Sequence, residues 1–167
     1  MSSKIHPHYQ EELAKVNKHH RKTIQVLKDL IRINKDRITV YEKAAHEDDG
    51  RPTDTRDILY RMATDSRAYV NELHAEVIRL GARPVTQETI TGKIYLFWLD
   101  LGALADAGNS DLTFLDACEH FEEAVQQAYH QALNAGDLTD EIHRLVERQL
   151  WAMEWTQGQI HNLNHTI

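Results

Sequence analysis

The sequence contains few of the residues from which disulfide, zinc and membrane structures are built. Its single cysteine, Cys118, excludes an internal disulfide bond and any zinc site with four cysteine ligands. No run of about 18 apolar residues occurs, so the sequence offers no candidate transmembrane helix. The start of the chain has Lys4, His6 and Pro7 where a signal peptide would have an apolar core. We therefore expect a cytoplasmic protein that does not bind membranes.

An excess of positive charge, which is typical of nucleic-acid-binding proteins, is also missing. The 167 residues include 19 Lys and Arg against 26 Asp and Glu, which gives a net charge of −7. This balance argues against nucleic acid as a partner. At about 100–200 residues per domain, we expect residues 1–167 to form one domain. A chain of this length can bury a core without disulfides or a structural metal.

Proline and glycine are scarce, and four of the glycines lie between segments with helical periodicity. Gly50, Gly81, Gly108 and Gly136 each fall where one apolar pattern stops and the next begins. No segment alternates apolar and polar residues with the two-residue period of a strand. The breaks predict an all-α domain with a flexible start at 1–9 and helical segments at 10–48, 54–80, 87–107, 110–135 and 138–165.

Four of these segments carry a single apolar stripe on an otherwise charged helix, which is typical of a helical bundle. The segment 87–107 differs, because the residues from Ile94 to Leu101 form an almost continuous apolar run. About 25 residues between the second and third bundle helices can cross the length of a bundle and make those two helices parallel. The pattern predicts a helical crossover at 87–107 and a ferritin-like four-helix bundle.

A set of residues between Leu27 and Leu163 supports this topology by its order and spacing. It includes Leu30-Ile31 with Asp36, Leu73 to Pro84, Gly92, Trp98, Cys118-Glu119 with Glu122-Glu123, Tyr129, Leu145 and Gln149. In these residues the chain resembles a bacterial family of ferritin-like four-helix bundles of unknown function. The resemblance implies the fold and a relation to iron-handling and stress proteins, with no activity attached.

A ferritin-like bundle raises the question of a di-metal site, which needs Glu from two helices and Glu-x-x-His from the other two. No glutamate of this chain is followed three residues later by histidine. Counting inward from the helix ends places Asn34, Arg37, Ser66, Glu122 and Gln149 at one height, with a single carboxylate among them. We interpret Asn34, Ser66, Glu122 and Gln149 as a hydrogen-bonded polar core layer that fixes the helix register. A proton-transfer site in this layer is an alternative.

A bound divalent metal, in this layer or at the end of the last helix, is the other alternative that the residues leave open. Glu119 and Glu122 present two carboxylates three residues apart. The 11 histidines are mostly dispersed among charged residues, but His161 and His165 have i,i+4 spacing. That spacing places both imidazoles on one helical face, where they could chelate a divalent ion. Cys118 falls on an apolar stripe, which predicts a buried and unreactive thiol.

Two tryptophans on the last helix point away from the predicted core. Trp151 and Trp155 lie about 200–240° around the helix axis from the apolar stripe. They would be covered either by the crossover, through Tyr95, Phe97 and Trp98, or by another subunit. Because tryptophan is enriched in interface hot spots, the second arrangement predicts a protein interface.

Together these patterns predict a protein with no catalytic residue and no cofactor. We expect it to act by protein association, as a homo-oligomer or with another protein, in a stress-related role. The alternative is a di-metal carboxylate protein of the ferritin-like class, either an iron-binding protein or an oxidase.

Overall fold

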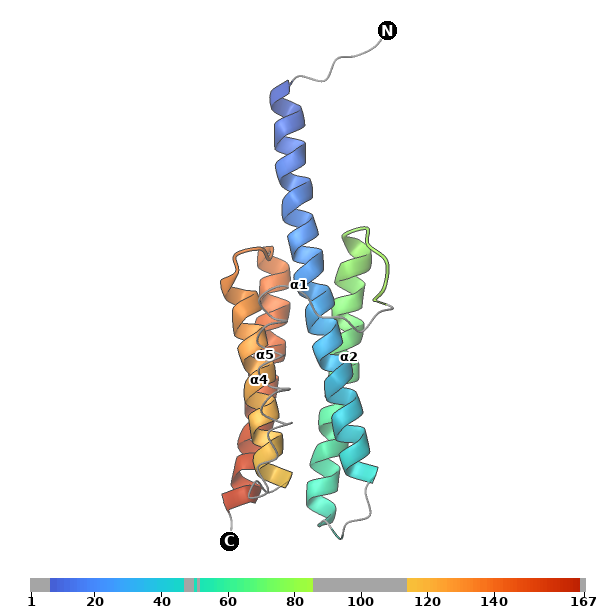
Figure 1. Cartoon of the computed structure of the whole chain (residues 1–167), viewed down its shortest axis with the longest axis vertical. Helices are drawn as coiled ribbons and strands as arrows, with labels where there is room; N and C mark the ends of the chain where they lie inside the picture. The colour runs from blue at the N-terminus through green and yellow to red at the C-terminus, as the bar shows by residue number, and fades with distance from the viewer. Residues whose placement is uncertain (1–6, 47–49, 51, 86–113, 166–167) are drawn as a thin grey trace.

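The computed structural model describes residues 7–46, 50, 52–85 and 114–165. These residues form four helices (Figure 1): α1 (Pro7–His46), α2 (Thr53–Arg79), α4 (Phe114–Asn134) and α5 (Asp140–His165). Within these ranges the structure contains no strand. The prediction of an all-α protein with four long helices is thereby confirmed.

Neighbouring helices around the bundle are antiparallel. Helix α1 packs against α2 and α4, and α5 packs against the same two helices. Between α1 and α4, Asn34 pairs with Tyr129 and Tyr41 pairs with Glu122, so the numbering rises along one helix as it falls along the other. The same opposite directions are visible for α2 and α5 (Figure 1). The diagonal pairs, α1 with α5 and α2 with α4, are therefore parallel.

Because α2 and α4 run in the same direction, the end of α2 lies far from the start of α4. Helix α2 ends at one end of the bundle, and α4 begins at the opposite end (Figure 1). The predicted crossover at 87–107, and the first four residues of the predicted helix 110–135, lie outside the described residues.

The apolar core consists of two clusters that lie one above the other along the bundle axis. The first includes Leu30, Ile33, Leu73 and Val125, and the second includes Met62. Apart from Val85, which follows α2, the members of both lie on the apolar faces of the helices. Burial of each large side chain contributes roughly 1.5–3 kcal/mol. The remaining members of the second cluster are Tyr41, Ala44, Ala45, Leu59, Ala63, Cys118 and Ile160.

The helix boundaries differ from the predicted ones where local chemistry decides them. Residues 7–9, which the sequence analysis assigned to a flexible start, belong to α1, because proline is well suited to the first helical position. Helix α5 begins at Asp140, two residues later than predicted, because the hydroxyl of Thr139 accepts the backbone N–H of Ile142 and caps the helix. Gly50, Gly81 and Gly136 have positive φ angles, as helix-terminating glycines require.

Helix α1 continues beyond the other three helices (Figure 1). We call its first 16 residues, 7–22, the α1 arm. Every side chain that the structure describes between Pro7 and His19 is exposed, and burial begins at Thr23. The hydroxyl of Thr23 hydrogen-bonds the backbone carbonyl of Asp137 between α4 and α5. At about 1.5 Å per residue, the arm extends roughly 24 Å from this point.

After α2 the chain turns back onto α1 and is held there by Val85. Its backbone N–H donates to Nε2 of His74, at 3.3 Å, and its carbonyl accepts a hydrogen bond from Nζ of Lys35, at 3.2 Å. The bond to His74 requires a neutral imidazole. Burial, together with the charge of Lys35, lowers the pKa of His74 below its ordinary value.

This contact predicts a loss of stability in mild acid. Because the folded pKa of His74 is lowered, the unfolded state takes up the proton first as the pH falls below about 6.5, and stability is lost as the pH falls toward the folded pKa. We expect wild type to lose more unfolding free energy between about pH 7.5 and about pH 5.5 than His74→Gln, by less than about 1 kcal/mol since the side chain is only half-buried. Urea unfolding at both pH values measures this difference, and equal losses in the two proteins would contradict it.

Candidate functional site

A buried ion pair joins three helices between the two apolar clusters. Nε of Arg37 on α1 donates to Oε1 of Glu122 on α4, at 2.7 Å, and Nη2 donates to Oε2 at 2.8 Å. The remaining guanidinium nitrogen, Nη1, donates to the hydroxyl of Ser66 on α2, at 2.8 Å. Tyr41 adds a hydrogen bond from its hydroxyl to Oε1 of Glu122, at 2.6 Å. All four side chains are buried.

The electrostatics of this group keep the guanidinium of Arg37 charged and the phenol of Tyr41 neutral. Burial opposes the positive charge of Arg37, but the carboxylate of Glu122 is strong enough to hold the pKa of Arg37 above its ordinary value. Burial and the same carboxylate raise the pKa of Tyr41. The Tyr41 hydroxyl therefore stays protonated and remains a donor to Glu122.

A second group of hydrogen bonds, which joins uncharged side chains before it reaches Glu72, continues the layer toward α5. Nδ2 of Asn34 donates to the hydroxyl of Tyr129 at 2.7 Å, and that hydroxyl donates to Oε1 of Gln149 at 2.8 Å. Nε2 of Gln149 then donates to Oε2 of Glu72, at 2.8 Å. The carboxylate of Glu72 also accepts from Arg148 at the surface, at 3.2 Å. Each side chain donates to the next, so the chain of bonds runs in one direction from α1 to the surface of α2.

We call these two groups together the polar layer. The structure brings Asn34, Ser66, Glu122 and Gln149, the four residues of the predicted core layer, into two neighbouring hydrogen-bond groups, all of them fully buried. The acceptor oxygen Oδ1 of Asn34 is the atom of these four residues that is buried without a partner among the described residues. A layer of this kind opposes sliding of one helix along another, because a shift would leave buried charges and amides unpaired.

The predicted core layer lacks Tyr41, Tyr129 and Glu72. Both tyrosines lie on the apolar faces of their helices, and their rings pack in the core. Tyr41 follows Arg37 by four residues, and Tyr129 follows Glu122 by seven, so each lies on the helix face of its polar neighbour. A buried tyrosine hydroxyl needs a partner, which is the signal that could have identified them.

The residues of the polar layer do not fit a di-metal centre. Both oxygens of Glu122 are already taken by Arg37, whose positive charge would repel a cation at the same position. The other carboxylate of the layer, Glu72, is engaged by Gln149 and Arg148 on the outer side of the bundle. A centre with two metal ions needs four carboxylates on facing helices, and these positions hold arginine, serine and amides instead.

Three of the four metal-ligand candidates lie together at the C-terminal end of α5. Nδ1 of His161 is 3.4 Å from Oε2 of Glu119 on α4, and the rings of His161 and His165 face each other with their centroids 4.1 Å apart. The fourth candidate, Glu122, points into the polar layer and is not part of this group. Among the described residues, this is the only cluster of three ligand-type side chains close enough to share one ion.

The two tryptophans on α5 are exposed, Trp151 by 68% and Trp155 by 75%. They are the most exposed large apolar side chains of the part of the chain that the structure describes, and they lie four residues apart on one helical face. The predicted cover by Tyr95, Phe97 and Trp98 falls on residues outside the described ranges. Cys118 is buried in the second apolar cluster, as its position on the stripe predicts.

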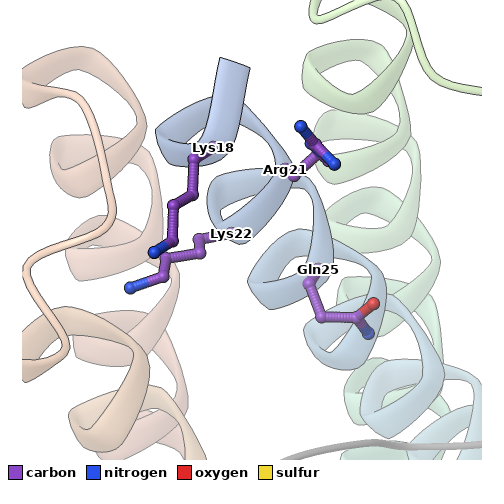
Figure 2. Close-up of a pocket in the computed structure, with 4 residues that line it drawn as sticks. All are labelled: Lys18, Arg21, Lys22 and Gln25. Carbon is purple, nitrogen blue, oxygen red and sulfur yellow. The ribbon is translucent and has the colours of Figure 1, made fainter. Parts of the chain in front are cut away.

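The base of the α1 arm forms a shallow basic hollow of about 460 Å³, lined by Lys18, Arg21, Lys22 and Gln25 (Figure 2). Lys18 and Lys22 point toward the α4–α5 end of the bundle, and Arg21 points toward α2 (Figure 2). Nζ of Lys22 lies 3.9 Å from Oδ1 of Asp137, so this lysine already has an acidic neighbour. Arg21 Nε donates to the backbone carbonyl of Asn17, at 3.4 Å. Among the described residues, neither Lys18 nor Arg21 has an acidic partner, so both cations can face an acidic group from outside.

Comparison with known families places the chain in one of them. The family described as "Domain of unknown function (DUF2383)" matches residues 22–135, which is more than half of the sequence. The chain belongs to this family. The match begins at Lys22, so it leaves out most of the α1 arm, and it ends before α5. No curated protein matches the chain. None of the four described helices is long and apolar enough to cross a membrane.

Proposed function

We propose that this protein is a non-catalytic bundle of ferritin-like topology that acts by associating with a second copy of itself through the α1 arm. The topology is supported by the parallel direction of α2 and α4 on one diagonal of the bundle and of α1 and α5 on the other. When the second and third bundle helices are parallel, one long connection must join them. Such a connection is a property of ferritin-like bundles.

The observation that carries the proposal is the α1 arm. It is a helix of about four turns that leaves the bundle, and its described side chains from Pro7 to His19 are exposed. An isolated helix of this length is marginal in water and gains most of its stability from packing. A second copy of the chain supplies the surface against which the arm packs.

The charge distribution favours another copy of this chain as that surface. The arm contains Lys15, Lys18, Arg21 and Lys22 against Glu11 and Glu12, so it carries +2. Since the whole chain carries −7, the remaining residues carry −9. The arm of one molecule is therefore attracted to the bundle of another, and in a twofold dimer the same contact forms twice.

Helix α5 offers an apolar surface on this acidic bundle. Trp151 and Trp155 are exposed there on one helical face. The arm extends roughly 24 Å, and the 16 residues from Asp140 to Trp155 also span about 24 Å, so an arm is long enough to lie along this part of α5. Buried tryptophans at the centre of such a contact would supply most of its binding energy.

Self-association is tested by sedimentation velocity of the full chain, in EDTA to exclude metal-mediated contacts. We expect a wild-type dimer, and at least about a tenfold weaker dimer for the charge-reversed arm, Lys15→Glu with Lys18→Glu and Arg21→Glu. Raising the salt concentration should also weaken the wild-type dimer, because salt screens the attraction between the basic arm and the acidic bundle.

The matched control reverses three exposed charges outside both the arm and α5, at Lys43, Arg67 and Arg83, and should leave the dimer intact. Trp151→Gln with Trp155→Gln tests the α5 surface independently of the arm, and this variant should also form a weaker dimer. A wild-type chain that remains monomeric at high concentration would overturn the proposal. So would an arm variant that dimerises as well as the control.

A di-metal carboxylate protein is the competing function. It has less support, because Arg37 neutralises the central carboxylate, Glu122, and no glutamate of the sequence precedes histidine by three residues. Elemental analysis of protein purified without a histidine tag tests it. Two ions per chain that persist when Glu119 and His165 are replaced would favour this competing function over the one proposed.

A further inference from the structure

The end of α5 brings together two histidines and one carboxylate from different helices. One ring nitrogen each of His161 and His165 and one oxygen of Glu119 all lie within 4.8 Å of one another. Glu119 is supplied by α4, and the histidines by the last turns of α5. The i,i+4 spacing of the histidines places both rings on the side of α5 that faces Glu119.

The hydrogen bond of His165 determines which of its nitrogens is available. Nδ1 lies 2.9 Å from the backbone carbonyl oxygen of His161. A carbonyl oxygen can only accept, so Nδ1 carries the proton and Nε2 keeps its lone pair. Metal-binding histidines commonly donate their other ring N–H to a backbone carbonyl in this way, which orients the ring and fixes the tautomer.

The spacing is close to that of a coordinated ion. Ligands at about 2.0–2.2 Å from a tetrahedral ion lie about 3.3–3.6 Å apart, so atoms within 4.8 Å of one another must approach by at most about 1.5 Å. Both histidine side chains are exposed and can turn by this amount without disturbing the core. The rings already lie 4.1 Å apart, and Nδ1 of His161 is already 3.4 Å from Glu119.

We propose that Glu119, His161 and His165 bind one divalent transition-metal ion such as Zn²⁺, which fastens the last turns of α5 to α4. Two imidazoles with one carboxylate suit Zn²⁺ and its first-row neighbours and not Mg²⁺ or Ca²⁺, which prefer sites made of oxygen ligands alone. Three protein ligands leave one position of a tetrahedral ion for water. The site lies at the bundle end, away from the polar layer, and does not depend on self-association.

The test uses the full chain without a histidine tag, stripped with EDTA and dialysed against ZnCl₂. We expect one zinc per chain by elemental analysis and a higher melting temperature with Zn²⁺ but not with Mg²⁺. Co²⁺ should give visible absorption bands of a four-coordinate ion. In His165→Ala and in Glu119→Gln the apparent Kd for Zn²⁺ should rise at least about tenfold, since loss of an outer-shell partner alone costs about 10–100-fold.

Matched histidine replacements separate this site from adventitious binding. His130→Ala removes a histidine that pairs with Glu154 in the middle of the bundle, and His8→Ala removes one that lies 3.6 Å from Glu12 on the arm. Both should bind one zinc as wild type does. The proposal is overturned if wild type retains no zinc, if His165→Ala binds zinc as tightly as wild type, or if His8→Ala abolishes the binding.

Discussion

Glu122→Gln is expected to lower the free energy of unfolding by about 3–5 kcal/mol, because it leaves the charge of Arg37 buried without a counter-ion. The substitution keeps the shape of the side chain but removes its charge and turns one acceptor oxygen into a donor. That amide would face a guanidinium, which can only donate. The Tyr41 hydroxyl also loses its charged acceptor. Urea unfolding followed by circular dichroism measures the loss.

A fully apolar replacement is the control for this prediction. Arg37→Met with Glu122→Met removes both charges, and Tyr41→Phe with Ser66→Ala removes the hydroxyls that bonded to them. Replacing a buried ion pair by apolar residues of similar volume is often neutral or stabilising. We therefore expect the fourfold variant to recover most of the stability that Glu122→Gln loses. A Glu122→Gln protein within about 0.5 kcal/mol of wild type would show that the ion pair is not buried as described.

Tyr129→Phe is expected to cost about 1–3 kcal/mol, because it removes the hydroxyl at the centre of the uncharged part of the layer. Burial raises the pKa of Tyr129, so the hydroxyl stays protonated and donates to Gln149. Phenylalanine keeps the ring packing but leaves the buried Oε1 of Gln149 without a donor. Asn34 loses one of the two acceptors of its amide group and keeps the backbone carbonyl of Leu30.

The matched control for Tyr129→Phe is Tyr60→Phe on α2. The Tyr60 side chain is exposed, and its hydroxyl has a single weak contact, at 3.4 Å, with His46. Its loss should change the unfolding free energy by less than about 0.5 kcal/mol. Thermal unfolding of both variants at one pH gives the comparison. Equal effects at the two positions would mean that the bonds around Tyr129 contribute no more than a surface hydroxyl.

The fold class could be predicted from the sequence because it depends on local patterns. Glycines at helix ends and a three-to-four-residue apolar period are properties of each segment by itself, and the structure has helices where these patterns fall. The helix ends were less accurate. Pro7 starts α1 because its backbone angle suits the first helical position, and Thr139 caps α5 with one hydrogen bond. Neighbouring residues can supply similar local preferences, so the sequence alone does not select one of them.

The position of the polar layer along the bundle axis could be predicted from the sequence, but its hydrogen bonds could not. Counting residues along each helix brings Arg37, Ser66 and Glu122 to one level, since the rise per residue of a helix is constant. The count does not say which side chains face each other across the bundle. That depends on the rotation of each helix about its axis, which the packing of all four helices sets together.

By itself, therefore, the sequence determined the all-α class, the approximate helices, part of the polar layer and the outward direction of Trp151 and Trp155. Only the tertiary structure decided that Arg37 neutralises Glu122, that the α1 arm leaves the bundle, and that Glu119 meets His161 and His165. The reason is physical. Period and spacing act within one helix, whereas ion pairs and ligand clusters form between residues of different helices, far apart in the chain.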